Sequence, residues 1–172
     1  MVQVTLENWE LELAWSVGSL RALRNAGRND APQYQNNDRQ DNVTGHVAGA
    51  CCELAVAKQA NRYWTAGVWP IQEHQLHKHL PDVMPNIEVR RVRERHNPVT
   101  VRRGDVESHR IIVAAYPHPN SFAVVDLIGW GNAAELWEIG KPSQYQNGGR
   151  FVDLCKLTPI EPKASSACLA DK

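Results

Sequence analysis

The part of this 172-residue chain best suited to chemistry is residues 80–92, LPDVMPNIEVRRV. Asp82 follows a proline, and Glu88 and Arg90 lie in an alternating run that predicts a β-strand. Because side chains alternate along a strand, Glu88 and Arg90 share one face and their apolar neighbours share the other. Two carboxylates with a cation two residues beyond the second can hold a hard divalent cation through oxygen and steady a water or a phosphate. The spacing therefore indicates magnesium-dependent phosphodiester chemistry.

Helical periodicity upstream places a third acid within reach of this pair. Residues 46–61 predict a helix with small, closely packable faces, with Thr44 as its N-cap and Glu53 near its middle. The loop after this helix is long enough to bring Glu53 back to Asp82. Four strands are predicted further along the chain, at residues 86–93, 98–103, 109–116 and 121–129, with a turn at 103–105.

Further elements are predicted around these strands: a strand at 2–6, helices at 8–26 and 131–138, and a last strand at 151–157. The large side chains of the first helix share one stripe, formed by Trp9, Leu13, Ser16 or Val17, Leu20 and Leu23. Residues 28–45 predict a polar loop, and residues 159–172 predict a flexible tail. We therefore expect one α/β domain over residues 1–158, with a mixed central β-sheet flanked by helices.

The arrangement resembles the PD-(D/E)xK nuclease superfamily, in which a helix carrying a Glu precedes strands that carry an Asp and then Glu-x-Lys. Here the matching residues are Glu53, Asp82 and Glu88–Val89–Arg90, with Arg90 in place of the usual Lys. The chain also resembles a class of small phage-type proteins with a Gly-x-x-x-Glu helix followed by Arg-Tyr-Trp, residues 62–64 in this sequence. The resemblance covers residues 45–155 and implies a restriction-endonuclease-like fold.

The same resemblance implies metal-dependent hydrolysis of DNA by a protein of phage or mobile-element type. Asp82, Glu88 and the backbone carbonyl of Val89 would ligate Mg²⁺ or Mn²⁺, and Glu53 would hold a second ion or a water. Arg90 stays protonated in proteins, so it cannot accept a proton from the attacking water. It can instead clamp a phosphate oxygen bidentately. The predicted catalytic set is therefore Glu53, Asp82, Glu88 and Arg90.

A local excess of arginine adjoins these acids, although the chain as a whole has 19 basic and 19 acidic residues and no net charge. Bulk charge thus gives no argument for nucleic-acid binding, and only local clustering on two neighbouring strands can line a groove for phosphates. We predict that DNA is bound by Arg91, Arg93, Arg95, Arg102 and Arg103.

The cysteines and the chain ends bear on the environment of the protein. The four cysteines, Cys51, Cys52, Cys155 and Cys168, include no CxxC pair, which favours reduced thiols over a disulfide framework. No neighbouring base identifies any of them as a nucleophile. We find no secretory signal and no apolar run of membrane-spanning length. We therefore expect a cytoplasmic protein, located in the host cytoplasm if it is phage encoded.

Other interpretations fit the same residues. Glu88 and Arg90 can form an ion pair on an exposed strand, where it contributes little stability. His74, His77 and His79 can ligate zinc, but they lack the spacing of a zinc finger, which favours a solvated loop or helix face. The main alternative function is a nuclease-like fold without catalysis that binds nucleic acid or a protein partner, and the Arg in place of Lys favours it. A purely structural or inhibitory accessory protein remains a third hypothesis.

Overall fold

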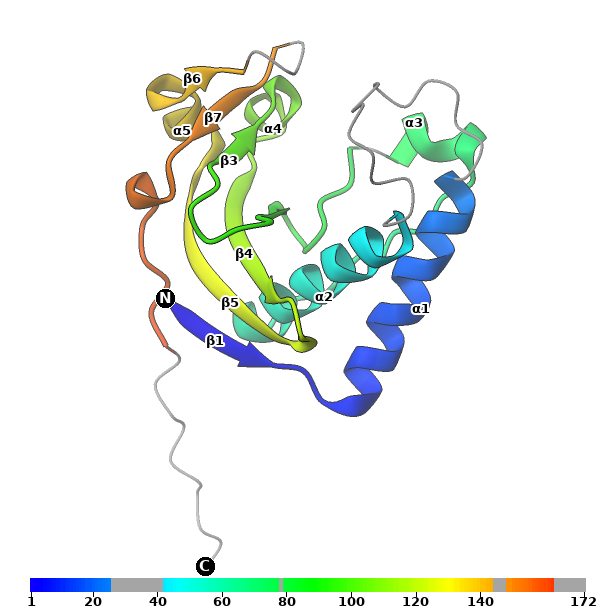
Figure 1. Cartoon of the computed structure of the whole chain (residues 1–172). Helices are drawn as coiled ribbons and strands as arrows, with labels where there is room; N and C mark the ends of the chain where they lie inside the picture. Colours follow the sequence, from blue (N-terminus) through cyan, green and yellow to red (C-terminus); the bar gives the residue numbers. More distant parts are fainter. Residues whose placement is uncertain (26–41, 78, 144–147, 163–172) are drawn as a thin grey trace, which may run out of the picture.

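The computed structural model of the chain describes residues 1–25, 42–77, 79–143 and 148–162. Its helices and strands, labelled in Figure 1, are β1 (Val2–Thr5), α1 (Asn8–Asn25), α2 (Asn42–Ala60), α3 (His74–His77), β2 (Ile87–Arg91), β3 (Val99–Val101), α4 (Arg103–Glu107), β4 (Ile111–His118), β5 (Ser121–Asn132), α5 (Ala133–Ile139), β6 (Lys141–Pro142) and β7 (Arg150–Val152). Two short 3-10 helices, Ile71–Glu73 and Leu154–Lys156, complete the described structure.

The strands form two sheets, a four-stranded sheet in the order β1-β5-β4-β2 and a three-stranded sheet in the order β3-β7-β6. In the larger sheet β2 runs parallel to β4, whereas β4–β5 and β1–β5 are antiparallel. Helices flank this mixed sheet, which confirms the predicted α/β class. Because β2 is the last strand in the order, one of its backbone edges is not paired with another strand of the sheet.

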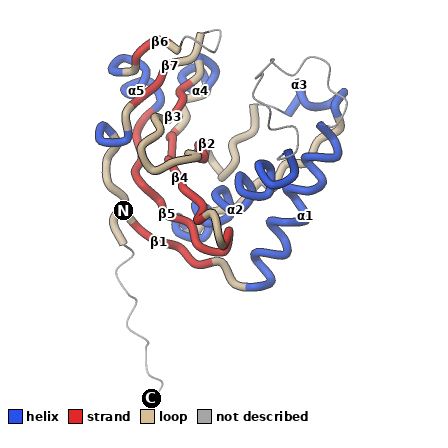
Figure 2. Tube along the Cα trace, in the orientation of Figure 1, coloured by secondary structure: helices blue, strands red, loops and turns tan. Residues whose placement is uncertain are grey.

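The long β4–β5 hairpin is covered on both faces (Figures 1 and 2). Val113 and Ala115 of β4 belong to the core formed with α1 and α2. The alternate residues Ile112 and Ala114 belong to a second core with β3, β7 and α5. This alternation follows from the two-residue period of a strand and explains why β4 is apolar along most of its length.

Helix α2 lies between α1 and the large sheet and is buried on almost all sides from Val47 to Ala57. A helix that is apolar all round suits such a central position. It ends where Asn61 adopts a left-handed φ of 53°. None of the described helices combines the length and the apolar composition that a membrane span requires.

The face of α1 that packs on α2 consists mainly of small side chains, and of the predicted stripe only Val17 is buried. Ala14, Gly18 and Ala22 are on the buried side, whereas Trp9 and Leu23 of the stripe are 60 % and 70 % exposed. A Cβ at Gly18 would lie only 2.4 Å from the Cα of Val47 in α2. The two helices therefore approach so closely that larger residues cannot lie between them.

Three predicted boundaries are wrong. Helix α2 begins at Asn42, so Thr44 is inside the helix rather than its N-cap, and residues 42–45 do not belong to the polar loop. The predicted turn at 103–105 is the helix α4, because the side chain of Asp105 accepts a hydrogen bond from the backbone N–H of Arg102 at 2.7 Å. The last predicted strand ends at Val152 and is followed by a 3-10 helix. The rest of the predicted loop, 28–41, and the tail from 163 lie outside the described residues.

We expect Gly18→Ala to lower the free energy of unfolding by about 1–3 kcal/mol, because the added Cβ meets helix backbone that cannot yield. The better helix propensity of alanine offsets about 1 kcal/mol of this loss. Gly49→Ala in α2 is the matched control, since no atom lies within 4 Å of its added Cβ. Urea unfolding measures both. A Gly18→Ala variant at least as stable as the wild type would contradict the close packing of α1 on α2.

Candidate functional site

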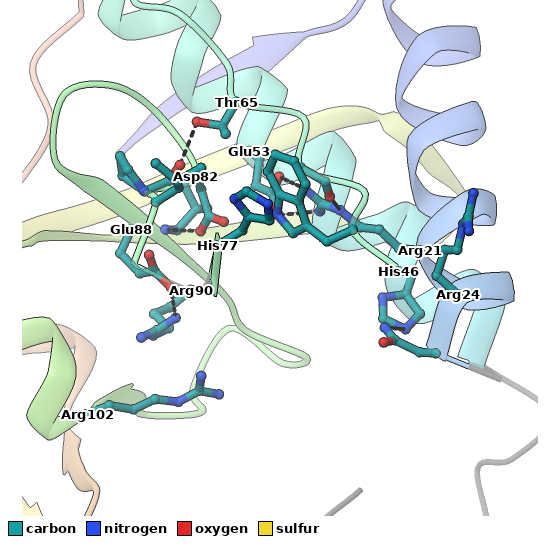
Figure 3. Close-up of a pocket in the computed structure, with 16 residues that line it drawn as sticks. Arg21, Arg24, His46, Glu53, Thr65, His77, Asp82, Glu88, Arg90 and Arg102 are labelled. Carbon is teal, nitrogen blue, oxygen red and sulfur yellow. Dashed lines mark hydrogen bonds and ion pairs between the residues drawn. The ribbon is translucent and has the colours of Figure 1, made fainter. Parts of the chain in front are cut away.

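One pocket of about 450 Å³ gathers the acids that the sequence singled out. Glu53, Asp82 and Glu88 all line it, together with Val89 and Arg90 (Figure 3). They come from α2, from the segment before β2 and from β2 itself. The structure therefore brings together the whole predicted catalytic set.

Asp82 lies against the unpaired edge of β2. Val83 and Ile87 exchange backbone hydrogen bonds of 3.0 and 2.8 Å, and Asp82 Oδ2 accepts the N–H of Val89 at 2.8 Å. The carboxylate thus takes the place of a neighbouring strand at this edge. The N–H and C=O of one strand residue point to the same side. The carbonyl oxygen of Val89 therefore faces the same edge as Asp82.

Arg90 connects β2 to the small sheet and to α4. Its Nη1 donates to Glu88 Oε1 at 2.7 Å, its Nη2 to both oxygens of Asp105 at 2.8 and 2.6 Å, and its Nε to the carbonyl of Thr100 at 3.0 Å. Burial disfavours the charge, but Glu88 and Asp105 outweigh it and raise the pKa of Arg90. The Glu88–Arg90 pair exists, but its side chains are only 19 % and 13 % exposed, so it is not the solvated surface pair considered above.

Glu53 is bound by groups that the sequence did not identify. Arg21 of α1 donates to its two oxygens at 2.6 and 2.8 Å, and Trp64 Nε1 donates to Oε2 at 2.9 Å. Arg21 Nε also donates to the carbonyl of Gly67 at 2.7 Å. As placed, Glu53 holds an arginine in the pocket rather than offering free oxygens to an ion. The sequence places Arg21 on a helix but gives no signal for a partner 32 residues away.

The pocket contains more carboxylates than paired cations. The pKa of Asp82 is raised well above its usual value, first because the carboxyl is buried and then because Glu53 and Glu88 carry like charge. The Val89 N–H and Arg90 oppose this shift only in part. A bound cation would relieve the same repulsion.

The donor atoms at this end of the pocket fit a hard divalent cation. Asp82 Oδ1 and Glu88 Oε2 have no hydrogen-bond partner among the described residues, and the Val89 carbonyl lies at the same edge. In the described part of the chain, no three His, Cys, Asp or Glu side chains converge on one point as metal ligands do. Two carboxylates supplemented by waters nevertheless suit Mg²⁺, which rarely has a cage made only of protein.

The five predicted DNA-binding arginines do not form one surface. Arg102 lines the pocket, and the guanidinium of Arg91 lies 3.8 Å from where a Cβ at Gly45 would be. Arg93 is exposed. Arg103 pairs with Glu107 at 3.4 Å. The two strands expected to be neighbours, β2 and β3, belong to different sheets. DNA binding by these arginines stays a prediction.

Arg95 is held away from the pocket by a buried carboxylate. It pairs with Asp126 of β5, which is fully buried and also contacts His118 Nε2 at 3.1 Å and Gln3 Nε2 at 3.1 Å. A buried charge needs such partners. Arg95 therefore supplies a partner to a carboxylate inside the sheet.

The far end and the middle of the pocket carry residues that the sequence did not single out as site residues. Arg24 of α1 and His46 of α2 line the end where Arg21 lies (Figure 3). The pKa of His46 is lowered by burial and by the positive charges of Arg21 and Arg91. His77, predicted as a solvated histidine, lines the middle and stacks on Trp69 with ring centroids 4.1 Å apart.

The cysteines beside Glu53 do not supply a nucleophile. Cys51 and Cys52 are fully buried in the core, and burial raises the pKa of Cys51 to about 12. Thiol groups in this state do not form the reactive thiolate at neutral pH.

No protein-family model, curated protein or solved structure matches this chain.

We expect Asp82→Asn to become more stabilising, relative to the wild type, as the pH rises from about 4 towards neutrality. Unfolded Asp82 ionises near its ordinary pKa of about 3.9, whereas the folded carboxyl ionises only at higher pH. Between these values the folded state binds more protons, so wild-type stability falls as pH rises. The substitution removes this titration. Urea unfolding in EDTA across this pH range measures the difference, and a difference that does not vary with pH would contradict the assignment.

Proposed function

We propose that this protein is a metal-dependent nuclease that hydrolyses DNA phosphodiester bonds, of the phage or mobile-element type that its sequence resembles. The observation that carries the proposal is the meeting of Asp82, Glu88 and the Val89 backbone at the open edge of β2. The resemblance of the sequence to the PD-(D/E)xK superfamily supports the proposal, since it assigns the metal ligands to these same residues. A divalent cation held there would lower the pKa of water and stabilise the charge that develops on the phosphate.

The chain's own residues hold the acids in place. The Val89 N–H fixes one oxygen of Asp82, and Arg90 fixes one oxygen of Glu88, so that the second oxygens have defined positions. Because Arg90 already makes four hydrogen bonds, to Thr100, Glu88 and both oxygens of Asp105, and its side chain is only 13 % exposed, we assign it a positioning role rather than the phosphate contact expected from the sequence.

We assign the phosphate contact to Arg102 instead. Its side chain is exposed, lines the pocket, and has no ion-pair partner within the described residues (Figure 3). A planar guanidinium can donate two parallel hydrogen bonds to a phosphate. Glu53, in turn, positions Arg21.

A second candidate is a nuclease-like protein that binds nucleic acid or a protein partner without cutting. The observation that favours it is the bidentate hold of Arg21 on Glu53, together with the Glu88–Arg90 pair, because both acids are already partly neutralised by the protein. This candidate differs from the first in its response to metal, which the following experiments measure.

We expect the wild-type protein to cut at least one of linear, circular or single-stranded DNA with Mg²⁺ or Mn²⁺, and none with EDTA. Asp82→Asn and Glu88→Gln should each reduce the rate about a hundredfold or more, since each removes charge that holds the cation. Glu138→Gln, an exposed residue of α5 outside the pocket, is the matched control and should cut normally. Gel assays measure the rates. An absence of cutting in every condition would reject the nuclease in favour of the binding protein.

Metal binding can be measured without activity. If Asp82 and Glu88 share a cation, Mn²⁺ should raise the free energy of unfolding by RT ln(1 + [L]/Kd), about 2.7 kcal/mol at a hundredfold excess over Kd. Asp82→Asn should remove most of this gain, because it removes one of the two carboxylate charges. Thermal melts of both proteins, each with and without Mn²⁺, give the comparison. An equal gain in stability from Mn²⁺ in the two proteins would contradict the proposed metal site.

A further inference from the structure

The pocket has two ends of opposite charge. Asp82 and Glu88 lie at the β2 end, whereas Arg21, Arg24 and His46 lie at the end formed by α1 and α2 (Figure 3). We call these the acid end and the basic end. A pocket with this polarity suits an anionic ligand that meets a cation at the acid end and the protein's own cations at the basic end.

The basic end has unused donors. Arg21 donates three of its five N–H groups to Glu53 and Gly67. Two N–H groups can therefore still donate, and Glu53 fixes the orientation of the guanidinium. Arg24, one helical turn further along α1, has no hydrogen-bond or ion-pair partner among the described residues. These are the features of a preorganised oxyanion site.

Further positive charge surrounds this end. The guanidinium of Arg91 lies beside Gly45, the neighbour of His46 in α2. The charges of Arg21 and Arg91 both act on the His46 ring, whose Nε2 lies 3.4 Å from Asn25 Nδ2. No acid apart from Glu53 is among the residues lining the pocket near this end, so an incoming anion gains attraction from several groups together.

Between the two ends the pocket is partly aromatic. His77 lies between them and stacks on Trp69, and both rings line the pocket together with Leu80 (Figure 3). Aromatic faces of this kind hold nucleobases by stacking, without reading their sequence.

We propose that the basic end binds the phosphate group next to the scissile one, so that the pocket holds a single nucleotide between two phosphates. Arg24 and His46 are then specificity residues for a strand whose nucleotide has left the duplex stack. This inference rests on the proposed function, because it takes the acid end as the place of the scissile phosphate.

The test uses deoxythymidine 3′,5′-bisphosphate, which has the two phosphates and the base but no diester to cut. Calorimetry with Mn²⁺ should show that it binds wild-type protein at least about tenfold more tightly than the 3′- or the 5′-monophosphate, because a second charge-assisted contact forms. The two monophosphates also show which end of the nucleotide contributes more. Inorganic pyrophosphate, which has similar charge but no nucleoside between its two phosphates, should bind no better than the monophosphates.

Arg24→Gln and His46→Gln should each remove most of the advantage of the bisphosphate over the tighter-binding monophosphate. Arg62→Gln is the matched control, since Arg62 is exposed and does not line the pocket. Thermal melts check that the variants fold. A bisphosphate advantage that is absent, that survives both substitutions, or that pyrophosphate equals would overturn the proposal.

These outcomes separate the inference from the function on which it rests. DNA cutting by a protein that shows no bisphosphate advantage overturns the second phosphate site and leaves the nuclease intact. An advantage that depends on Arg24, in a protein that cuts no DNA with any metal, supports the basic end as a phosphate site and rejects the nuclease.

Discussion

The site depends on one constraint: three carboxylates share a pocket, and arginine side chains pair with only two of them. Arg21 holds Glu53 and Arg90 holds Glu88, but Asp82 has only a backbone N–H. Burial and the like charges of Glu53 and Glu88 raise the pKa of Asp82, because both disfavour its ionised form. A cation brought to the pocket would favour the ionised form. The fold therefore creates a place where added positive charge is stabilising.

The two arginines that pair with these carboxylates connect the pocket to distant parts of the molecule. Arg21 belongs to α1, at the outer side of the helical layer, and Arg90 reaches the small sheet and α4 on the opposite side (Figure 1). The edge strand β2 lies between them. The site is consequently assembled where the two cores of the protein meet, and its charges depend on both.

Local pattern was sufficient to predict much of this framework. Alternation predicted β1 and β2, helical periodicity predicted α1, and the spacing of Asp82 and Glu88 identified the acid end. Local pattern failed where contacts between residues far apart in the sequence determine the structure. Residues 103–105 have turn-forming composition. Asp105, however, accepts hydrogen bonds from the side chain of Arg90 and from the backbone N–H of Arg102, and these contacts stabilise a helix.

The basic end was missed for a related reason. Arg24 is one basic residue on an exposed helix, and nothing in its neighbourhood along the chain distinguishes it from a solvated arginine. Only the packing of α1 on α2 places it beside His46. The position of His77 likewise depends on the Trp69 ring on which it stacks. Trp69 lies eight positions earlier, and the loop and 3-10 helix between them follow no single period from which the contact could be predicted.

The close packing of α1 on α2 serves the pocket as well as the core. Gly18 meets Val47 at backbone distance, and Arg21 lies one turn beyond Gly18 on the same helix. An arginine side chain has a limited reach, so its two hydrogen bonds to Glu53 depend on the two helices lying close together. If larger residues moved the helices apart, Glu53 would lose its cation and become a second uncompensated acid beside Asp82. The small side chains of α1 thus set the charge balance of the site through the distance between two helices.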